Sequence, residues 1–249
     1  MLGLHMPECI LFALFNFFNF STNSSAQTVS GFTQIQNSPY AKDDNFAYHW
    51  NCQSMPYNSL SICWQIIKGS HSATFKVLNY RYAVDKSHAY CEGVAISNAD
   101  PSTFAVVLPQ YSTPKTNAYY YKFAKDKYRA YCFGEPLEGS DPSSFVAIDE
   151  AFAVDDNHAY CRNTIIKEAD PGKFKVIQAN EFASDGKYIY VFSSGFSCEE
   201  YQIIDADIKT FSKIKRRSKV DKDTPIYQDK DYWYCSISPS GIRKIRKQK

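Results

Sequence analysis

The sequence lacks a strong excess of charge of either sign. Its 28 basic and 26 acidic residues leave a formal net charge of +2 over 249 residues. Proteins that track the phosphate backbone usually carry a basic patch or stripe, so this balance argues against a nucleic-acid partner. The chain also has no Gly-x-Ser-x-Gly, no His-Glu-x-x-His and no phosphate-binding glycine loop. The familiar signatures of a serine hydrolase, a zinc protease and a nucleotide-binding protein are therefore missing.

Long hydrophobic runs are missing as well. The longest one, Ile10 to Phe20, is too short for a bilayer, which takes about 20 apolar residues. Small polar residues follow it at 21–26 and offer the small-x-small pattern that a signal peptidase recognises. We expect residues 1–26 to be a signal peptide, with a short membrane-surface anchor as the alternative. The mature chain, 27–249, is then expected to be secreted or to lie in the periplasm or cell envelope, as one domain without a transmembrane span.

Glycine and methionine are modest, at 10 and 3 residues, whereas tyrosine and phenylalanine are abundant, at 19 and 18. Aromatic side chains fit the half-buried surface of a pleated sheet. No amphipathic segment is long enough to predict a helix with conviction. Composition therefore favours an all-β fold.

The chain repeats itself. Three segments align without gaps: an aromatic-Ala-x-Asp opening, an Ala-Tyr-Cys soon after, an Asp-Pro at a constant offset, and a closing Phe with an aliphatic residue. Weaker copies flank these three and bring the number of units to six. Their opening aspartates are Asp43, Asp85, Asp126, Asp155, Asp185 and Asp229. An internal period of this size is typical of repeat architectures.

The local chemistry of one unit predicts a β-hairpin. The aromatic-Ala-x segment alternates as a strand does, and the Asp that follows it opens a turn whose backbone amides it can bind. Ala-Tyr-Cys then begins a second strand. Asp-Pro-x-x-Phe predicts a further turn or a single helical turn, with Asp as the cap and Pro at the first position. We therefore interpret the repeated aspartates as turn caps and not as acid–base pairs, and His88 and His158, which share one hairpin position, as structural.

These units resemble repeats of the DKNYY family, found chiefly in exported bacterial proteins. The resemblance rests on Asp229-Lys230-Asp231-Tyr232-Trp233 and on the Asp…Ala-Tyr-Cys…Asp-Pro-x-x-Phe units, and it covers about residues 40–235. The chain departs from the family pattern where a second Tyr is usual, because cysteine stands there in four units. The resemblance implies an exported repeat protein and brings no activity or catalytic residues with it.

Six such units suit a propeller or a solenoid. The segment Gly31 to Ile35 matches the closing strand of a unit, whereas the hairpin around Asp229 lacks a clear closing strand. We therefore expect a β-propeller-like closed ring of about six repeats, in which the N-terminal strand pairs into the last sheet. The alternative is an open β-solenoid or stack of β-hairpin repeats.

Removal of the leader leaves seven cysteines, an odd number. Four of them share one repeat position: Cys91, Cys132, Cys161 and Cys235. They are too far apart in sequence for the close ligand pairs of a zinc site, and a sheet apart is too far for a disulfide. We expect them to be small buried hydrophobic residues with free thiols. Cys52 and Cys63 are the candidate disulfide across a hairpin, and Cys198 is expected to be unpaired.

Two irregular insertions are rich in aromatic residues, and insertions in repeat proteins map to loops on the binding face. The candidate ligand-binding residues are Trp64, Tyr111, Tyr119, Tyr120 and Tyr121. The basic segments 213–222 and 243–249 are interpreted as a solvated loop and tail. We expect a monomeric, non-catalytic interaction module with a protein or glycan partner and without metal or cofactor. The alternatives are a propeller-type hydrolase of glycans or esters and a purely structural envelope protein.

Overall fold

The computed structural model describes residues 28–29, 31–35, 38–51, 64–110, 121–178, 182–192, 198, 201–214, 225–237 and 241–247. Within these ranges the regular structure is β-sheet, apart from short 3₁₀ turns at Ser72–Thr74 and Pro171–Lys173. The all-β prediction is confirmed. No helix among these residues is long and apolar enough to cross a membrane.

The strands form six small antiparallel sheets, and within each sheet the strands lie in sequence order. Sheet 1 contains β1 (Thr28–Val29), β2 (Phe32–Gln34), β3 (Tyr40–Lys42), β4 (Ala47–Trp50) and β5 (Trp64–Ile66). Sheet 2 contains β6 (Lys76–Val77), β7 (Tyr82–Val84), β8 (Ala89–Cys91) and β9 (Val94–Ala95). Sheet 3 contains β10 (Ala105–Val106), β11 (Phe123–Lys125), β12 (Ala130–Cys132) and β13 (Glu135–Pro136).

The remaining sheets follow the same plan. Sheet 4 contains β14 (Val146–Ala147), β15 (Phe152–Val154), β16 (Ala159–Cys161) and β17 (Thr164–Ile165). Sheet 5 contains β18 (Lys175–Gln178), β19 (Phe182–Ser184), β20 (Ile189–Phe192) and β21 (Tyr201–Ile204). Sheet 6 contains β22 (Ser212–Lys213), β23 (Pro225–Gln228), β24 (Tyr232–Ile237) and β25 (Gly241–Arg246).

The predicted hairpin forms the centre of every sheet. In sheet 3, Phe123 pairs with Cys132 and Lys125 with Ala130, and Asp126 opens the turn between the strands. A further strand follows the cysteine through a two-residue turn. Phe133 and Gly134 both have positive φ there, at 53° and 82°, which is what the tight turns favoured in hairpins require. The sequence reading did not anticipate this fourth strand.

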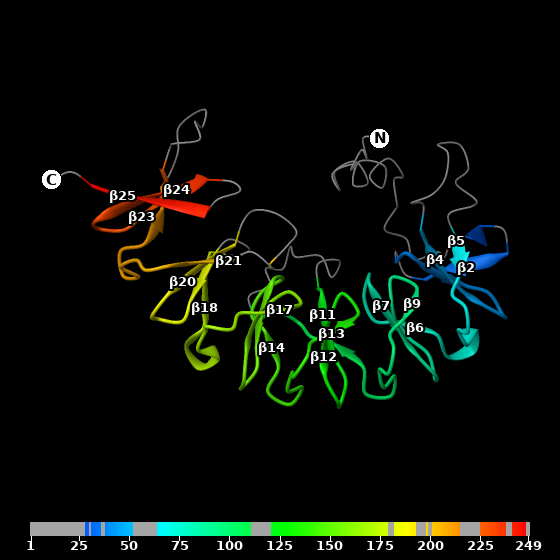
Figure 1. Ribbon diagram of the computed structural model, residues 1–249. Coiled ribbons are helices and arrows are strands. Elements are labelled where there is room, and N and C mark those ends of the chain that lie inside the picture. Colours follow the sequence, from blue (N-terminus) through cyan, green and yellow to red (C-terminus); the bar gives the residue numbers. More distant parts are fainter. Residues whose placement is uncertain are drawn as a thin grey trace, which may run out of the picture.

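The six sheets follow one another along an arc, from sheet 1 (blue) to sheet 6 (red), and these two sheets lie at its opposite ends (Figure 1). The strand exchange predicted to close a ring is wrong. β2 pairs with β1 and β3 within sheet 1, and sheet 6 is completed by its own β25. The physical reason is local: β2 is joined by a short connection to β3 and pairs with it, as the first strand of each later sheet pairs with the hairpin that follows it. β2 therefore supplies the first sheet and leaves no half-unit for the last one.

A ladder of aromatic rings holds neighbouring sheets together. The Phe before each first strand packs on the Tyr of its own hairpin and on the opening aromatic of the preceding sheet. Phe145, for example, lies with its ring centroid 5.7 Å from that of Tyr160 and 5.7 Å from that of Phe123. The same pairs recur as Phe75 with Tyr90 and Tyr40, Phe104 with Tyr131 and Tyr82, Phe174 with Tyr190 and Phe152, and Phe211 with Tyr234 and Phe182. These rings are buried, so the core of the protein lies between the sheets.

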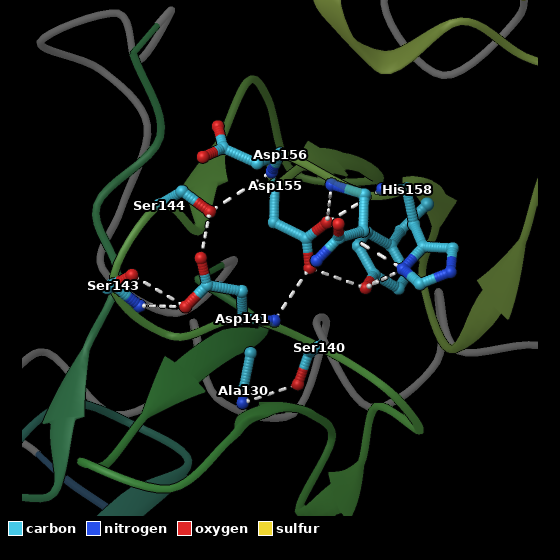
Figure 2. Close-up of polar contacts among 10 residues, drawn as sticks. Ala130, Ser140, Asp141, Ser143, Ser144, Asp155, Asp156 and His158 are labelled. Carbon is cyan, nitrogen blue, oxygen red and sulfur yellow. Dashed lines mark hydrogen bonds and ion pairs between the residues drawn. The ribbon is translucent and has the colours of Figure 1, made fainter.

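The repeated aspartates of sheets 2 to 6 each add a polar clamp to this ladder, which Figure 2 shows for Asp155. Its Oδ1 accepts hydrogen bonds from the amides of Asn157 and His158, at 2.8 and 2.7 Å. Its Oδ2 accepts from the Tyr160 hydroxyl at 2.7 Å and from the amide of Asp141 at 2.9 Å. Asp141 lies in the loop from the preceding sheet, so one buried carboxylate caps its own turn and also fastens two sheets together.

Candidate functional site

The aspartate-turn end and the opposite end of each hairpin lie on different sides of the arc. The aspartate turns lie beside the 3₁₀ turns, since the amide of His71 bonds Asp85, and the 3₁₀ turns lie on the convex side of the arc (Figure 1). The opposite ends therefore face the concave side. We call the side chains that flank the hairpins at these ends in sheets 2, 3 and 4 the concave rim: Arg81, Glu92, Lys122, Phe133 and Arg162.

The concave rim combines cations with an exposed aromatic ring. The Arg81 guanidinium pairs with Glu92 of its own sheet and lies 4.7 Å from the centroid of the Phe133 ring in the next sheet. The Lys122 ammonium lies 5.4 Å from the same centroid. Phe133 is 36% exposed. The rim is thus a continuous surface that crosses from sheet 2 to sheet 3.

The electrostatics of the rim centre on Lys122. Partial burial lowers the pKa of Lys122, and the positive charges of Arg162 and Arg81 lower it further, whereas Glu150 opposes the shift. Cations from three consecutive sheets are therefore close enough to repel one another. An acidic ligand would relieve that repulsion.

The rim stands on a closely packed base. A Cβ on Gly93 would come within 2.6 Å of the His49 Cβ, and one on Gly134 within 2.7 Å of the Cys91 Cβ. Both glycines also have positive φ, at 80° and 82°. Burial lowers the pKa of His49 to about 4, so this imidazole is neutral at physiological pH. Consecutive sheets thus converge tightly at the concave ends, which keeps the rim residues in fixed relative positions.

The prediction for the four cysteines that share one repeat position is partly confirmed. Cys91, Cys132 and Cys235 are buried. Cys91 and Cys132 are free thiols, and burial raises the pKa of each to about 12. Thiols with such pKa values stay protonated and unreactive. Cys161, however, forms a disulfide with Cys198, with a Cα–Cα distance of 5.7 Å. The expectation of a free Cys161 and an unpaired Cys198 was wrong because Cys198 lies outside the repeat column, and only the folded chain returns it to Cys161.

Of the five candidate ligand-binding residues, Trp64 and Tyr121 lie in the part of the chain that the structure describes. Tyr121 directly precedes Lys122 of the rim, and its carbonyl accepts a hydrogen bond from the side-chain Nδ2 of Asn79 at 3.2 Å. Tyr111, Tyr119 and Tyr120 lie outside the described residues, as do both members of the candidate disulfide, Cys52 and Cys63. Trp64 belongs to sheet 1 and Tyr121 to the segment entering sheet 3, so the two come from sheets that are not consecutive.

Trp64 lies instead on a second surface, which we call the open face of sheet 1. It consists of the side chains on the side of that sheet away from sheet 2: Phe32, Tyr48, Trp50, Trp64 and Ile66. The Phe32 ring stacks on Tyr48 at 4.9 Å and meets Trp64 at 5.3 Å, and Trp50 meets Trp64 at 5.2 Å. Ile66 is 51% exposed.

The repeated carboxylates have structural roles as hydrogen-bond acceptors. Burial tends to raise the pKa of Asp85, Asp126, Asp185 and Asp229, but hydrogen bonds from the hairpin tyrosine and from backbone amides outweigh it and lower each pKa. A shallow cavity of about 350 Å³ beside sheet 6 is lined by Asp207, Asp229 and Lys230, of which Asp207 pairs with Lys230 and Asp229 belongs to a clamp. Among the described residues, no three potential metal ligands cluster together.

Sequence reasoning missed the rim because its members occupy positions that differ from one repeat of this chain to the next, on either side of each repeated hairpin. A usable signal existed: an acidic, aromatic or basic residue directly after the cysteine, followed by Gly or Asn, marks the tight turn to the fourth strand. The residue directly before the opening aromatic is basic in sheets 2 and 3. Those two positions meet because they pair across the hairpin end, where the Glu92 amide donates to the Arg81 carbonyl at 2.7 Å.

Comparison with protein families gives a match that extends over most of the chain. The family description is DKNYY family, and the matches cover residues 16–122, 57–194 and 123–247. No curated protein and no solved structure shows a significant match to the chain.

Proposed function

The chain belongs to the DKNYY family, and we propose that it is an exported, non-catalytic binding module of the secreted space or cell envelope. The concave rim is its recognition surface. The observation that carries this proposal is the contact across sheets 2 and 3, in which Arg81 and Lys122 flank the exposed ring of Phe133. Stacked repeats commonly use a concave surface built from several units to bind extended partners.

The chemistry of the rim favours an acidic partner. A guanidinium and an ammonium beside an aromatic ring can bind carboxylate or sulfate groups while the ring edge contacts apolar surface. Burial is the main cause of the lowered pKa of Lys122, and the neighbouring positive charges lower it further, so an anion at the rim would gain from neutralising these charges. An acidic glycan of the envelope fits this description, and so does an acidic protein surface.

A binding assay on intact cells tests the proposal. The double variant Arg81→Ala/Lys122→Ala should bind at least about tenfold more weakly than the native protein, since each charge-assisted contact contributes roughly 1.5 kcal/mol or more. Lys68→Ala/Lys86→Ala is the matched control, because it removes the same charge from exposed positions off the rim and should bind normally. Equal binding by both double variants would contradict the proposed site. Protease treatment of the cells should abolish a protein partner, and periodate oxidation a glycan partner.

Export is tested independently. Mass spectrometry of the protein recovered from the medium or the envelope should find a mature N-terminus near Gln27. An intact leader on protein that remains in the cytoplasm would contradict export, whatever the binding assay shows.

A further inference from the structure

The five junctions between consecutive sheets follow one plan. At each junction the later sheet presents a Phe whose ring packs at a tilt or edge-on against its hairpin Tyr, and its clamp aspartate accepts an amide from the earlier sheet's loop. The donors are the amides of His71, Asp100, Asp141, Asp170 and Asp207. We call the face of the later sheet at a junction its receiving face. Such a face is thus recognisable from its own residues alone.

Sheet 1 has such a receiving face. Phe32 packs on Tyr48 with the ring centroids 4.9 Å apart, at the position where the corresponding Phe of sheets 2 to 6 packs on its own hairpin Tyr. Asp43 caps its turn through the amides of Asn45 and Phe46, at 2.8 and 2.7 Å, and accepts the Tyr48 hydroxyl at 2.6 Å. Sheet 1 therefore retains the tyrosine, the phenylalanine and the aspartate of a junction.

What this face lacks, within the described part of the chain, is its partner sheet. The hairpin tyrosines of the five covered junctions are 0% exposed, whereas Tyr48 is only half-buried. No described residue donates the loop amide that every other clamp aspartate receives. Trp50, Trp64 and Ile66 extend the apolar surface beside these residues, and such a surface on a sheet at the end of an array marks an interaction site.

Sheet 6 has a corresponding outward face at the other end of the array. Tyr234 packs inward on Phe211, so its strand neighbour Trp233 points away from sheet 5 and is 38% exposed. Ile245 pairs with Trp233 on the neighbouring strand. Lys247 extends along this face with its ammonium 6.0 Å from the centroid of the Trp233 ring. Arg243, two residues before Ile245, lies on the same side of β25, so the outward face carries the apolar pair of Trp233 and Ile245 with a cation on either side of Ile245 along the strand.

We propose that the outward face of sheet 6 docks on the open face of sheet 1 of a second copy of this chain, head to tail. Two observations point to this occupant. The contact would repeat the arrangement of the five internal junctions. It would also bring the positively charged Lys247 toward the negatively charged Asp43 and Asp44 in the aspartate turn of sheet 1. A contact between two different faces produces a closed ring of copies or an open array. This differs from the monomer expected from the sequence, and it is independent of ligand binding at the concave rim.

The two end sheets of one chain are separated by the opening of the arc (Figure 1), which favours a second chain over the same chain. Analytical ultracentrifugation of the mature protein over a concentration series should show reversible dimers or larger species. Ile66→Lys, on the open face, and Trp233→Lys, on the outward face, should each raise the dissociation constant roughly 30-fold or more, as loss of a central interface residue does. Leu108→Lys is the control and should associate normally, because Leu108 is 65% exposed and lies in the connection from β10 to β11 of sheet 3, away from both end faces.

Mixing the two interface variants tests the direction of the contact. Each variant retains one intact face, so an equimolar mixture of Ile66→Lys and Trp233→Lys should form dimers and nothing larger. Circular dichroism should show that both variants are folded. A native protein that stays monomeric at all concentrations, or closes on itself, would overturn the proposal, and so would undiminished association of Ile66→Lys. Because Ile66→Lys leaves the rim intact, its binding to cells should persist, so failure of one proposal can be told from failure of the other.

Discussion

The clamp aspartate makes a quantitative prediction, for which Asp126 is the best test. Its Oδ1 accepts the amides of Tyr128 and Arg129 at 2.7 and 3.0 Å. Its Oδ2 accepts the Tyr131 hydroxyl at 2.7 Å and the Asp100 amide at 2.9 Å. All four partners are donors, and the residue is only 3% exposed. The site therefore requires a group that accepts on both oxygens.

Asp126→Asn preserves the size of the side chain but replaces one acceptor with a donor. If the asparagine oxygen faces the turn, its NH₂ group faces the Asp100 amide; if it faces Asp100, the NH₂ group faces the turn amides. Either orientation leaves at least one buried donor opposite another donor, and an unsatisfied buried polar group costs about 1–3 kcal/mol. Loss of the charge on the remaining hydrogen bonds adds to this. We expect the free energy of unfolding to fall by about 2–4 kcal/mol.

Urea unfolding followed by tryptophan fluorescence provides the assay, with the transition midpoint as the readout. Asp43→Asn is the matched control, because Asp43 makes the same turn and tyrosine contacts but receives no inter-sheet amide from a described residue. Its midpoint should fall by clearly less. If the two variants unfold at the same urea concentration, the inter-sheet bond contributes nothing and the reasoning is refuted.

Three further predictions concern pH, packing and redox state. The pKa of His49 falls from 6.5 to about 4 on folding; the unfolded chain therefore binds the proton first, and stability that is complete above pH 6.5 should decrease by roughly 3 kcal/mol as the pH falls to 4. In His49→Val, which has no imidazole at this position, the loss of stability between pH 6.5 and pH 4 should be smaller by the same amount. Urea midpoints measured across this pH range test this, and an unchanged pH dependence would contradict the role of His49. Gly134→Ala should lower the melting temperature more than Gly186→Ala, because both glycines have positive φ but only Gly134 has a neighbour in the way; calorimetry giving equal losses would exclude the close approach as the cause. Cys198→Ser, which opens the disulfide to Cys161 across a sequence separation of 37, should reduce the free energy of unfolding by about 2–4 kcal/mol, and a reductant should then no longer shift the unfolding midpoint of the variant as it shifts that of the native chain.

Sequence alone determined the unit of this fold. The spacing of aromatic-Ala-x-Asp and Ala-Tyr-Cys specified the hairpin, because strand alternation and aspartate turns are local properties. Asp170 shows how far such local reasoning extends. Its side chain accepts from the Gly172 amide at 3.1 Å and caps the 3₁₀ turn that begins at Pro171, as Asp-Pro-x-x-Phe predicted.

Local reasoning failed where partners come from different sheets. Nothing near Asp155 in the sequence indicates that its second oxygen receives the amide of Asp141. The disulfide of Cys161 was missed for the same reason. The concave rim, too, exists only because the curvature of the array brings Arg81 of one sheet over Phe133 of the next.

The repeats therefore encode each sheet and one side of every junction, namely the Phe, the Tyr and the aspartate of the later sheet. The sheet and the loop amide that meet this side are brought to it only by the tertiary structure. A hairpin is stabilised by residues a few positions apart, and their order in the chain already specifies it. The junctions are sheet-on-sheet contacts between units, so their register, the curvature of the arc and the open face left on sheet 1 depend on how whole sheets pack.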